Sequence, residues 1–114
     1  MGRFDDLGLK AVQLGKDHLL VITGGTAHIG AASMAYTEAD ERIVTAQTAA
    51  VPGHKEHRLT DLLVRKISRE LGITALLVMG IHYDGLDPEE IREISIQTER
   101  MIDEYIAGVK GVNP

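Results

Sequence analysis

The sequence has no cysteine, no tryptophan and few other aromatic residues. Its 114 residues include one phenylalanine and three tyrosines. Without cysteine the chain forms no disulfide bond, has no thiol nucleophile and offers no thiolate to a metal ion. With so few aromatic rings, extensive ring stacking on a ligand is excluded as well.

Clustered positive charge and long apolar runs are also missing. Twelve Lys and Arg residues against seventeen Asp and Glu residues give a formal net charge of −5, without a basic stripe. Nucleic acid is therefore excluded as the main partner, because neutralising its phosphates requires a basic surface. No apolar segment approaches the roughly 18 residues of a membrane-spanning helix, and residues 1–6 lack the apolar region of a signal peptide. We expect a cytoplasmic protein with no membrane partner.

Length and composition fit one globular domain. The chain is close to the commonest domain size, and 44% hydrophobic with 25% charged residues is ordinary for a globular protein. No repeat, linker or low-complexity segment interrupts it. We expect residues 1–114 to form a single domain.

The first half of the chain predicts four strands. Leu9–Leu14 and His18–Thr23 have a short glycine-containing turn between them and predict a hairpin. Ala31–Thr37 and Ile43–Val51 follow, separated by a charged turn. Both are rich in small residues, which leave room either for a tightly packed helix or for a ligand close to the sheet.

The second half begins with a helix and the most apolar strand of the chain. A helix of roughly 17 residues is predicted to open at Pro52-Gly53-His54 and to end before Gly72, a residue suited to a helix C-terminus. The strand Ile73–Ile81 follows, and we expect it at the centre of the sheet. The predicted buried stripe of the helix consists of Leu59, Leu62, Leu63, Ile67 and Leu71.

The clearest helix start in the sequence is Asp87-Pro88-Glu89-Glu90. Asp87 is a good capping residue, Pro88 suits the first helical position, and Glu90 completes a capping-box pattern. We predict that the C-terminal end of this helix frays from Gly108 onward. The predicted buried stripe consists of Ile91, Ile94, Thr98, Met101, Ile102 and Tyr105.

The order β-β-β-β-α-β-α predicts an α+β two-layer sandwich. A mixed five-stranded sheet would carry both helices on one face. The strands around residues 19–22 and 75–81 are apolar on both faces, so the face without helices also needs cover. We therefore expect a homo-oligomer, most simply a dimer, that buries this face.

Three polar segments follow strand ends, at residues 23–30, 52–58 and 80–85. The first contains three glycines, which allow positive φ and close backbone approach. It is either an elaborate turn or a cradle for a polar ligand, and we favour the cradle. Four of the five histidines lie in these segments, and we expect the fifth, His18, to be structural.

A phosphate is one candidate ligand for these segments. Gly25–Gly30 has P-loop spacing, but Ala31 and Ala32 stand where nucleotide hydrolysis requires Lys and Ser or Thr, so that motif is excluded. Glycine-loop amides and a helix start with Lys55 and Arg58 nevertheless both attract phosphate. Cations at a helix N-terminus oppose the helix dipole, so a bound anion would explain them. A solvated basic turn is the alternative.

A metal site is a second candidate. His54 and His57 are three residues apart on one predicted helix face, and His28 and His82 could converge on them. Three imidazoles and one open position would suit zinc. No zinc-binding motif is present, and we predict that no metal is tightly bound.

Acid–base chemistry is a third candidate. Asp84 and Glu56 each have a histidine two residues away, and either carboxylate could act as general acid or base if the distances allow it. No catalytic triad or nucleophile elbow is present, and we predict no catalytic residue.

Taken together, the polar segments resemble the LpdD-like family of small proteins. The resemblance spans about residues 18–106 with the segments in matching order. Two positions depart from the family pattern, since Ala27 stands where Pro is common and Gly85 where Asn is common. The matching segments are Thr23–Ala31, Pro52–Glu56, Gly80–Asp84 and Glu89–Ile91.

This resemblance implies a prenylated-flavin chaperone associated with UbiD-type decarboxylases. The ligand would be prenylated FMN, or FMN, with its phosphate at the glycine loop and helix start and its ring near Ala31, Ala32 and Ala46. The cofactor would supply any chemistry. A UbiD-type decarboxylase and a UbiX-type prenyltransferase are the implied partners. The predicted cofactor-binding residues are Gly24, Gly25, Thr26, His28, Ile29, Gly30, His54, Lys55, Arg58, His82 and Asp84.

Two other functions stay open at this point. One is a small metal- or acid/base-dependent enzyme that uses the same histidines on a phosphorylated molecule. The other is a non-catalytic accessory subunit of a decarboxylase that binds a protein partner and no ligand. A UV-visible spectrum of protein produced with and without the prenyltransferase distinguishes all three.

Overall fold

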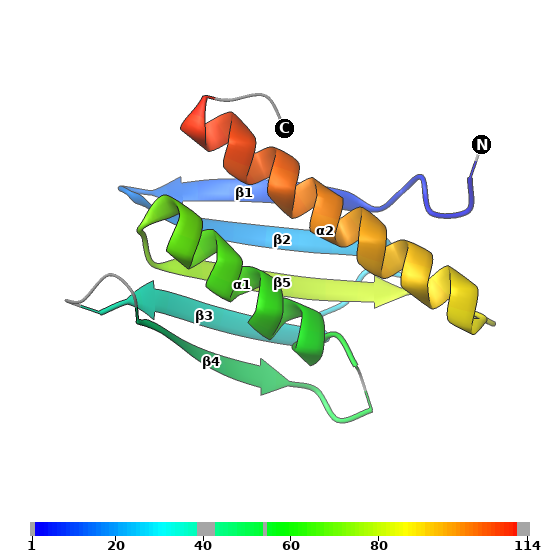
Figure 1. Cartoon of the computed structure of the whole chain (residues 1–114). Coiled ribbons are helices and arrows are strands. Elements are labelled where there is room, and N and C mark those ends of the chain that lie inside the picture. Colours follow the sequence, from blue (N-terminus) through cyan, green and yellow to red (C-terminus); the bar gives the residue numbers. More distant parts are fainter. Residues whose placement is uncertain (1, 39–42, 54, 112–114) are drawn as a thin grey trace.

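The computed structural model describes residues 2–38, 43–53 and 55–111, and in them shows a five-stranded mixed sheet with two helices (Figure 1). The order β-β-β-β-α-β-α confirms the predicted α+β fold. The strands are β1 (Gly8–Leu14), β2 (Asp17–Gly25), β3 (Ala31–Thr37), β4 (Val44–Ala50) and β5 (Ala75–His82). The helices are α1 (His57–Leu71) and α2 (Pro88–Lys110).

The last strand of the chain lies at the centre of the sheet, as its apolar sequence predicts. The strand order is β1-β2-β5-β3-β4. β5 pairs parallel to β2 and antiparallel to β3, so that Leu77 lies between Leu20 and Ser33. β1–β2 and β3–β4 are antiparallel hairpins, one on each side of β5.

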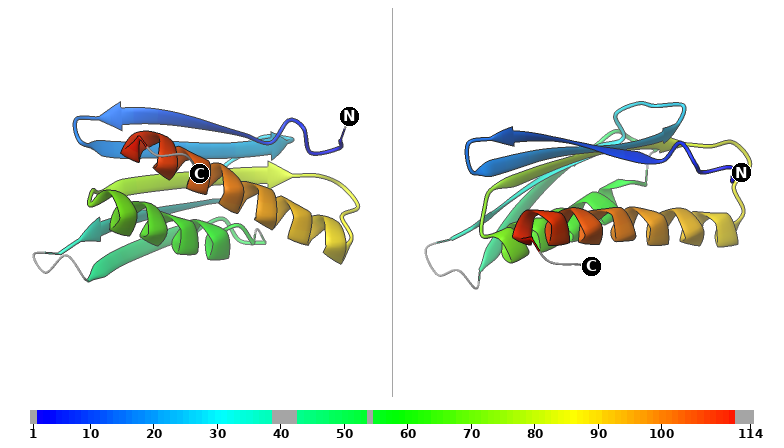
Figure 2. Two further views of the ribbon diagram at one scale, coloured as in Figure 1. Left: turned by 45° about the horizontal axis from the view of Figure 1, so that its top comes forward. Right: turned by 90° about the horizontal axis from the view of Figure 1, so that it is seen from above.

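Both helices cover the same face of the sheet (Figure 2). Burial alternates along β2 because successive side chains point to opposite faces of the sheet. Leu20 and Ile22 are fully buried under the helices, whereas Leu19 and Val21, on the other face, are only half-buried. The main core residues are Leu20, Ile22, Ala35, Leu63, Val64, Ile67, Ala75, Leu77, Met79, Ile102 and Ile106.

The opposite face of the sheet carries an apolar row that crosses four strands. The pairing registers place Val12 beside Leu19, Leu19 beside Leu76, and Leu76 beside Met34. Val12 and Met34, at the two ends of the row, are 49% and 42% exposed. Within the described part of the chain, no helix covers this face (Figure 2).

Helix α1 begins later than the sequence predicts. Pro52 and Gly53 form a turn, and Gly53 has φ of 86°, a conformation that a right-handed helix does not contain. Its end is as predicted, with Gly72 in the left-handed region. Leu62 is 61% exposed and not part of the buried stripe. The buried residues of α1 are Thr60, Leu63, Val64, Ile67 and Ser68.

Helix α2 starts as predicted but continues past the expected end. The capping box of Asp87 and Glu90 is present. The helix runs through Gly108, so the predicted fraying there is wrong; it ends at Gly111 in the left-handed region. Ile106 packs in the core and Lys110 pairs with a glutamate of α1, contacts that outweigh the low helix propensity of one glycine.

Helix α1 packs against the small residues of β3 and β4. Ala31 and Ala35 are fully buried and Ala46 packs against the core, so tight helix packing is the correct one of the two alternatives. Ala31 is thus inaccessible to a ligand ring, whereas Ala46 is only partly buried and Ala32 lies on the opposite sheet face. The expectation that the ring lies near these alanines is wrong for Ala31 and stays a prediction for Ala32 and Ala46. In residues 2–38, 43–53 and 55–111, no helix combines the length and apolarity needed to cross a membrane.

Candidate functional site

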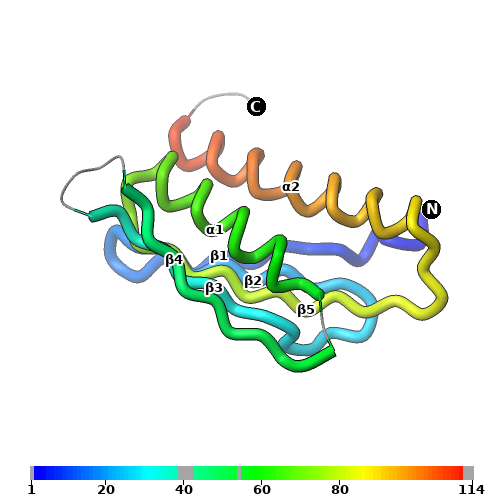
Figure 3. The backbone as a smooth tube through the Cα atoms, turned by 60° about the horizontal axis from the view of Figure 1, so that its bottom comes forward, coloured from blue at the N-terminus to red at the C-terminus, as the bar shows by residue number. Residues whose placement is uncertain are grey.

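The candidate site lies at the end of the sheet where β2 and β5 finish and both helices begin (Figure 3). Because β2 and β5 are parallel, their carboxyl ends coincide, with Gly25 beside His82. A groove of about 410 Å³ opens there between α1, β5 and α2. This volume lies within the range of small-molecule sites. We call it the α1–α2 groove.

The α1–α2 groove combines cations with apolar side chains. Lys55 and Arg58 contribute positive charge from the start of α1, and His82 and Tyr83 contribute polar groups from the end of β5. Apolar side chains make up much of the rest, namely Leu59, Met79, Ile81, Leu86, Ile91 and Ile94. Ile91, predicted to be buried, is instead 52% exposed because it belongs to this groove rather than to the core.

The start of α1 lacks the features that usually stabilise a helix N-terminus. Its N-cap residue, Glu56, makes no side-chain capping bond, and its first turn contains no acidic residue. The Glu56 carboxylate instead accepts the amide hydrogen of Ile81 at 3.1 Å. Backbone donors at this end therefore carry their partial positive charge beside Lys55 and Arg58.

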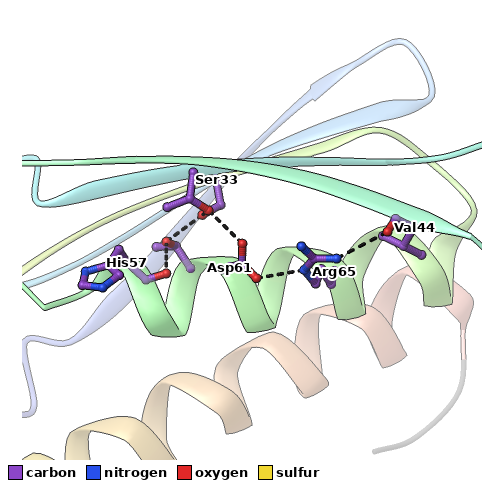
Figure 4. A network of polar contacts seen from close by, with 7 residues as sticks. Ser33, Val44, His57, Asp61 and Arg65 are labelled. Atoms are coloured by element: carbon purple, nitrogen blue, oxygen red, sulfur yellow. Dashed lines mark hydrogen bonds and ion pairs between the residues drawn. The ribbon is translucent and has the colours of Figure 1, made fainter.

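A buried hydroxyl network fixes α1 on the sheet (Figure 4). Ser33 Oγ is hydrogen-bonded to Thr60 Oγ1 at 2.8 Å and to Thr48 Oγ1 at 2.6 Å. Thr48 donates to Asp61, whose other oxygen accepts from Arg65 at 2.8 Å. The Arg65 hydrogen bond, with that of Thr48, lowers the pKa of Asp61. The network joins β3 and β4 to the first turns of α1.

His28 and Glu56 form a tightly packed pair beside the groove. His28 Nε2 lies 3.2 Å from Glu56 Oε2. A β-carbon at Gly30 would lie 2.3 Å from the same carboxylate, and one at Gly80 would lie 1.5 Å from the His28 carbonyl oxygen. Gly80 is therefore required by contact with the His28 backbone, and a side chain at Gly30 would displace the Glu56 carboxylate. The His28 and His82 ring centres are 6.3 Å apart, and the convergence of these two histidines on His54 and His57 stays a prediction.

Three amides of the glycine loop donate to acceptors within the protein. The bonds run from Gly25 to Asp6 Oδ2 (2.8 Å), from Thr26 to the His82 carbonyl (3.0 Å) and from Gly30 to the Met79 carbonyl (3.0 Å). These three donors are engaged, whereas Lys55 and Arg58 line the groove itself. A phosphate is therefore better served by the start of α1 than by this loop.

The structure brings together some of the predicted cofactor-binding residues. Lys55, Arg58 and His82 line the groove. His28 does not line it but contacts Glu56, which does. The remaining described residues lie near this end of the sheet without lining the groove, and among them Ile29 is 68% exposed. His54 lies outside the described residues. Ligand contact by any of these residues stays a prediction. The residues outside the groove lining are Gly24, Gly25, Thr26, Ile29, Gly30 and Asp84.

Sequence reasoning missed the groups that hold Tyr83. Its hydroxyl donates to Asp6 Oδ1 at 2.5 Å, and Phe4 packs against its ring. Burial and the Asp6 carboxylate raise the pKa of Tyr83, while the hydrogen bonds from Tyr83 and from the Gly25 amide lower that of Asp6. The one available signal was Phe4, the only phenylalanine of the chain, in an otherwise polar stretch.

The described histidines and carboxylates do not assemble a metal site. In residues 2–38, 43–53 and 55–111, no three His, Asp or Glu side chains are arranged to hold a metal ion. Because His54 is not among these residues, the predicted absence of tightly bound metal stays a prediction, to be checked by elemental analysis.

Comparison with known proteins gives one match. The family model described as "Prenylated flavin chaperone LpdD-like domain" matches residues 3–110. No curated protein matches the chain significantly. The matched range includes every strand and helix, the α1–α2 groove and Arg3 to Asp6 of the N-terminal segment.

Proposed function

Because the chain belongs to the prenylated flavin chaperone LpdD-like family, we propose that it binds prenylated FMN and delivers it to a UbiD-type decarboxylase. A UbiX-type prenyltransferase would supply the cofactor. The family membership supports flavin binding, and the α1–α2 groove is the site that we propose for the flavin.

One observation carries the proposal: Lys55 and Arg58 meet a largely apolar groove at a helix start whose first turn has no acidic residue, and the carboxylate of the N-cap residue Glu56 is engaged by the Ile81 amide and His28. Lys55 and Arg58 complement the phosphate of FMN, and the helix dipole adds to their effect. Apolar side chains from α1, β5 and α2 complement the enlarged ring. The bound flavin would supply the redox and decarboxylation chemistry, while this chain binds and orients it.

The position of the groove suits a protein that releases its ligand. Ile91 is exposed and the His82 side chain is 51% exposed, so the groove opens to solvent. A flavin held there keeps one side accessible to a receiving enzyme. We identify no catalytic residue in the groove, and the proposed role requires none.

The test is production of the protein with and without the prenyltransferase, followed by UV-visible spectroscopy. We expect a flavin-like band only after coproduction, and transfer of that flavin to the apo-decarboxylase on mixing. Stoichiometric zinc with turnover of a phosphorylated molecule would instead favour the enzyme alternative. Neither flavin nor metal would favour the accessory subunit.

The uncovered sheet face supports a further proposal, that the protein is a homo-oligomer, most simply a dimer. The apolar row from Val12 to Met34 would be buried by a second copy. Met34→Asp should shift the sedimentation coefficient to that of the monomer without changing the far-UV spectrum. A wild-type protein that sediments only as a 12.4 kDa monomer at micromolar concentration would contradict this.

We also propose that residues 1–114 act as one domain and that the protein is cytoplasmic. The single sheet with both helices packed on one core supports one domain. A single cooperative unfolding transition is expected by calorimetry. Two separate transitions would contradict it.

A further inference from the structure

We propose that Tyr83 contacts the flavin ring in the α1–α2 groove and that the N-terminal segment, residues 2–7, holds the Tyr83 side chain in position. The inference rests on the proposed function, because it assigns a binding residue and its support for the same ligand. Tyr83 is the one aromatic side chain among the described residues that line the groove.

The Asp6 carboxylate joins Tyr83 to the glycine loop. One oxygen accepts the Tyr83 hydroxyl at 2.5 Å, and the other accepts the Gly25 amide at 2.8 Å. The low pKa of Asp6 and the high pKa of Tyr83 keep the acceptor charged and the donor protonated at neutral pH. The tip of the ring is therefore fixed to a residue 77 positions earlier in the chain.

Phe4 and Arg3 hold the same tyrosine and the loop that follows it. Phe4 is 5% exposed and meets Tyr83 edge to face, with ring centres 4.8 Å apart. The Arg3 guanidinium lies 5.9 Å from the Tyr83 ring centre, pairs with Glu90 of α2 at 3.0 Å and donates to the Asp84 carbonyl. The segment thereby connects the end of β5 to the start of α2, two walls of the groove.

The glycine loop provides the space that this arrangement needs. A β-carbon at Gly24 would lie 2.6 Å from the Tyr83 hydroxyl oxygen and 2.7 Å from a methyl group of Leu7. At Gly25 it would lie 2.9 Å from the Tyr83 ring, and the backbone there has φ of 67°. A side chain at Gly24 would therefore displace Tyr83 or Leu7, while Gly25 is required mainly by the His82 carbonyl oxygen, 2.0 Å from the β-carbon position, and by its positive φ.

The experiment is titration of the protein with prenylated FMN, following affinity and the absorption spectrum of the bound flavin. Tyr83→Leu keeps an apolar side chain but removes the ring, and we expect Kd to rise about 10-fold with a shifted flavin band. Tyr83→Phe and Asp6→Ala each remove the hydroxyl–carboxylate bond. Each should raise Kd about 3- to 10-fold, the effect of one hydrogen bond.

A double-mutant cycle tests whether Asp6 acts through Tyr83. The combined Asp6→Ala/Tyr83→Phe variant should bind about as well as Asp6→Ala alone, because Asp6→Ala already removes the bond that Tyr83→Phe removes. Additive losses of affinity would overturn the positioning role of Asp6. These two single variants also decide the question if Tyr83→Leu fails to fold.

Tyr105→Phe is the matched control. The Tyr105 hydroxyl is hydrogen-bonded to Nδ1 of His18, a buried histidine outside the groove lining whose structural role is as predicted. Its loss should lower the melting temperature and leave flavin affinity and spectrum unchanged. A Tyr105→Phe variant that loses affinity as Tyr83→Phe does would overturn the assignment to the groove.

The two proposals fail in different ways. If the wild-type protein retains no prenylated FMN, the proposed function falls and this inference with it. If the wild-type protein binds the flavin and the Tyr83 and Asp6 variants bind it with the same affinity and spectrum, the function stands and the inference is overturned.

Discussion

The two helices of this protein begin in opposite ways. α2 starts with Asp87 accepting the Glu90 amide at 2.8 Å, while the Glu90 side chain accepts the Asp87 amide at 3.2 Å. α1 starts after Glu56, which makes no capping bond, and its first turn contains Arg58 and no acid. The start of α2 has a capping box, whereas the start of α1 has no side-chain cap and carries positive charge from Arg58.

This difference separates stability from binding within one fold. Both helix starts lie at the same end of the sheet and lead into the same groove. At α1 the nearest carboxylate, Glu56, is held by His28 and the Ile81 amide and is therefore not available as a cap. We interpret the start of α1 as the binding half of the pair and the start of α2 as the stabilising half.

The largest expected effect comes from removing the cations at the start of α1. Lys55→Ala and Arg58→Ala should each lower affinity for prenylated FMN about 10- to 150-fold, the effect of losing one charge-assisted hydrogen bond of roughly 1.5–3 kcal/mol. Stability should be unchanged or slightly higher, because the helix dipole no longer faces a cation. Flavin titration and thermal melts measure the two quantities. Normal binding with earlier melting would mean that the basic turn is structural.

The next largest effect comes from removing the cap at the start of α2. Asp87→Ala removes the cap of α2 and should lower the free energy of unfolding by about 1 kcal/mol, within a range of 0.5–2. Urea unfolding measures this change. Flavin affinity should change far less than in the two cation variants. A loss of affinity as large as theirs would show that the two helix starts do not divide the roles.

The smallest expected change in stability comes from giving α1 a start that resembles that of α2. Arg58→Glu places an acid in the first turn and should raise the free energy of unfolding by about 0.3–1 kcal/mol while abolishing flavin binding. The matched control is Arg58→Gln, which removes the charge without reversing it and should lie between the wild type and Arg58→Glu in stability. A destabilised Arg58→Glu variant would contradict the dipole argument.

Local patterns predicted the elements of the fold better than their ends. Ala31–Thr37 matches the predicted strand residue for residue, and the capping box at Asp87 locates the start of α2. The start of α1 was missed because φ of 86° at Gly53 cannot be read from the residue type. Gly108 was misjudged because packing of the last turn of α2 depends on contacts with α1.

The site was predicted in part, for a related reason. Lys55 and Arg58 stood out because their position opposes a general rule for helix ends. The contact between His28 and Glu56 depends on strand β5 passing beneath the glycine loop, and that between Asp6 and Tyr83 joins residues 77 positions apart. Such contacts follow from tertiary structure, and the lone Phe4 in a polar stretch is the one sign of them in the sequence.

The central position of β5 has a consequence for how the chain folds during synthesis. Until Ala75 is made, the two hairpins have no common neighbour, since their only link in the sheet is β5. Pairing of His18 with Ala75 spans 57 positions, which a ribosome covers in roughly 3–11 seconds. Isolated two-stranded hairpins are marginally stable, so the backbone groups at the apolar strand edges of the first half of the chain stay unpaired until β5 is made. Nascent chains stalled before Ala75 should therefore remain protease-sensitive, and protection should arise in one step once β5 has emerged.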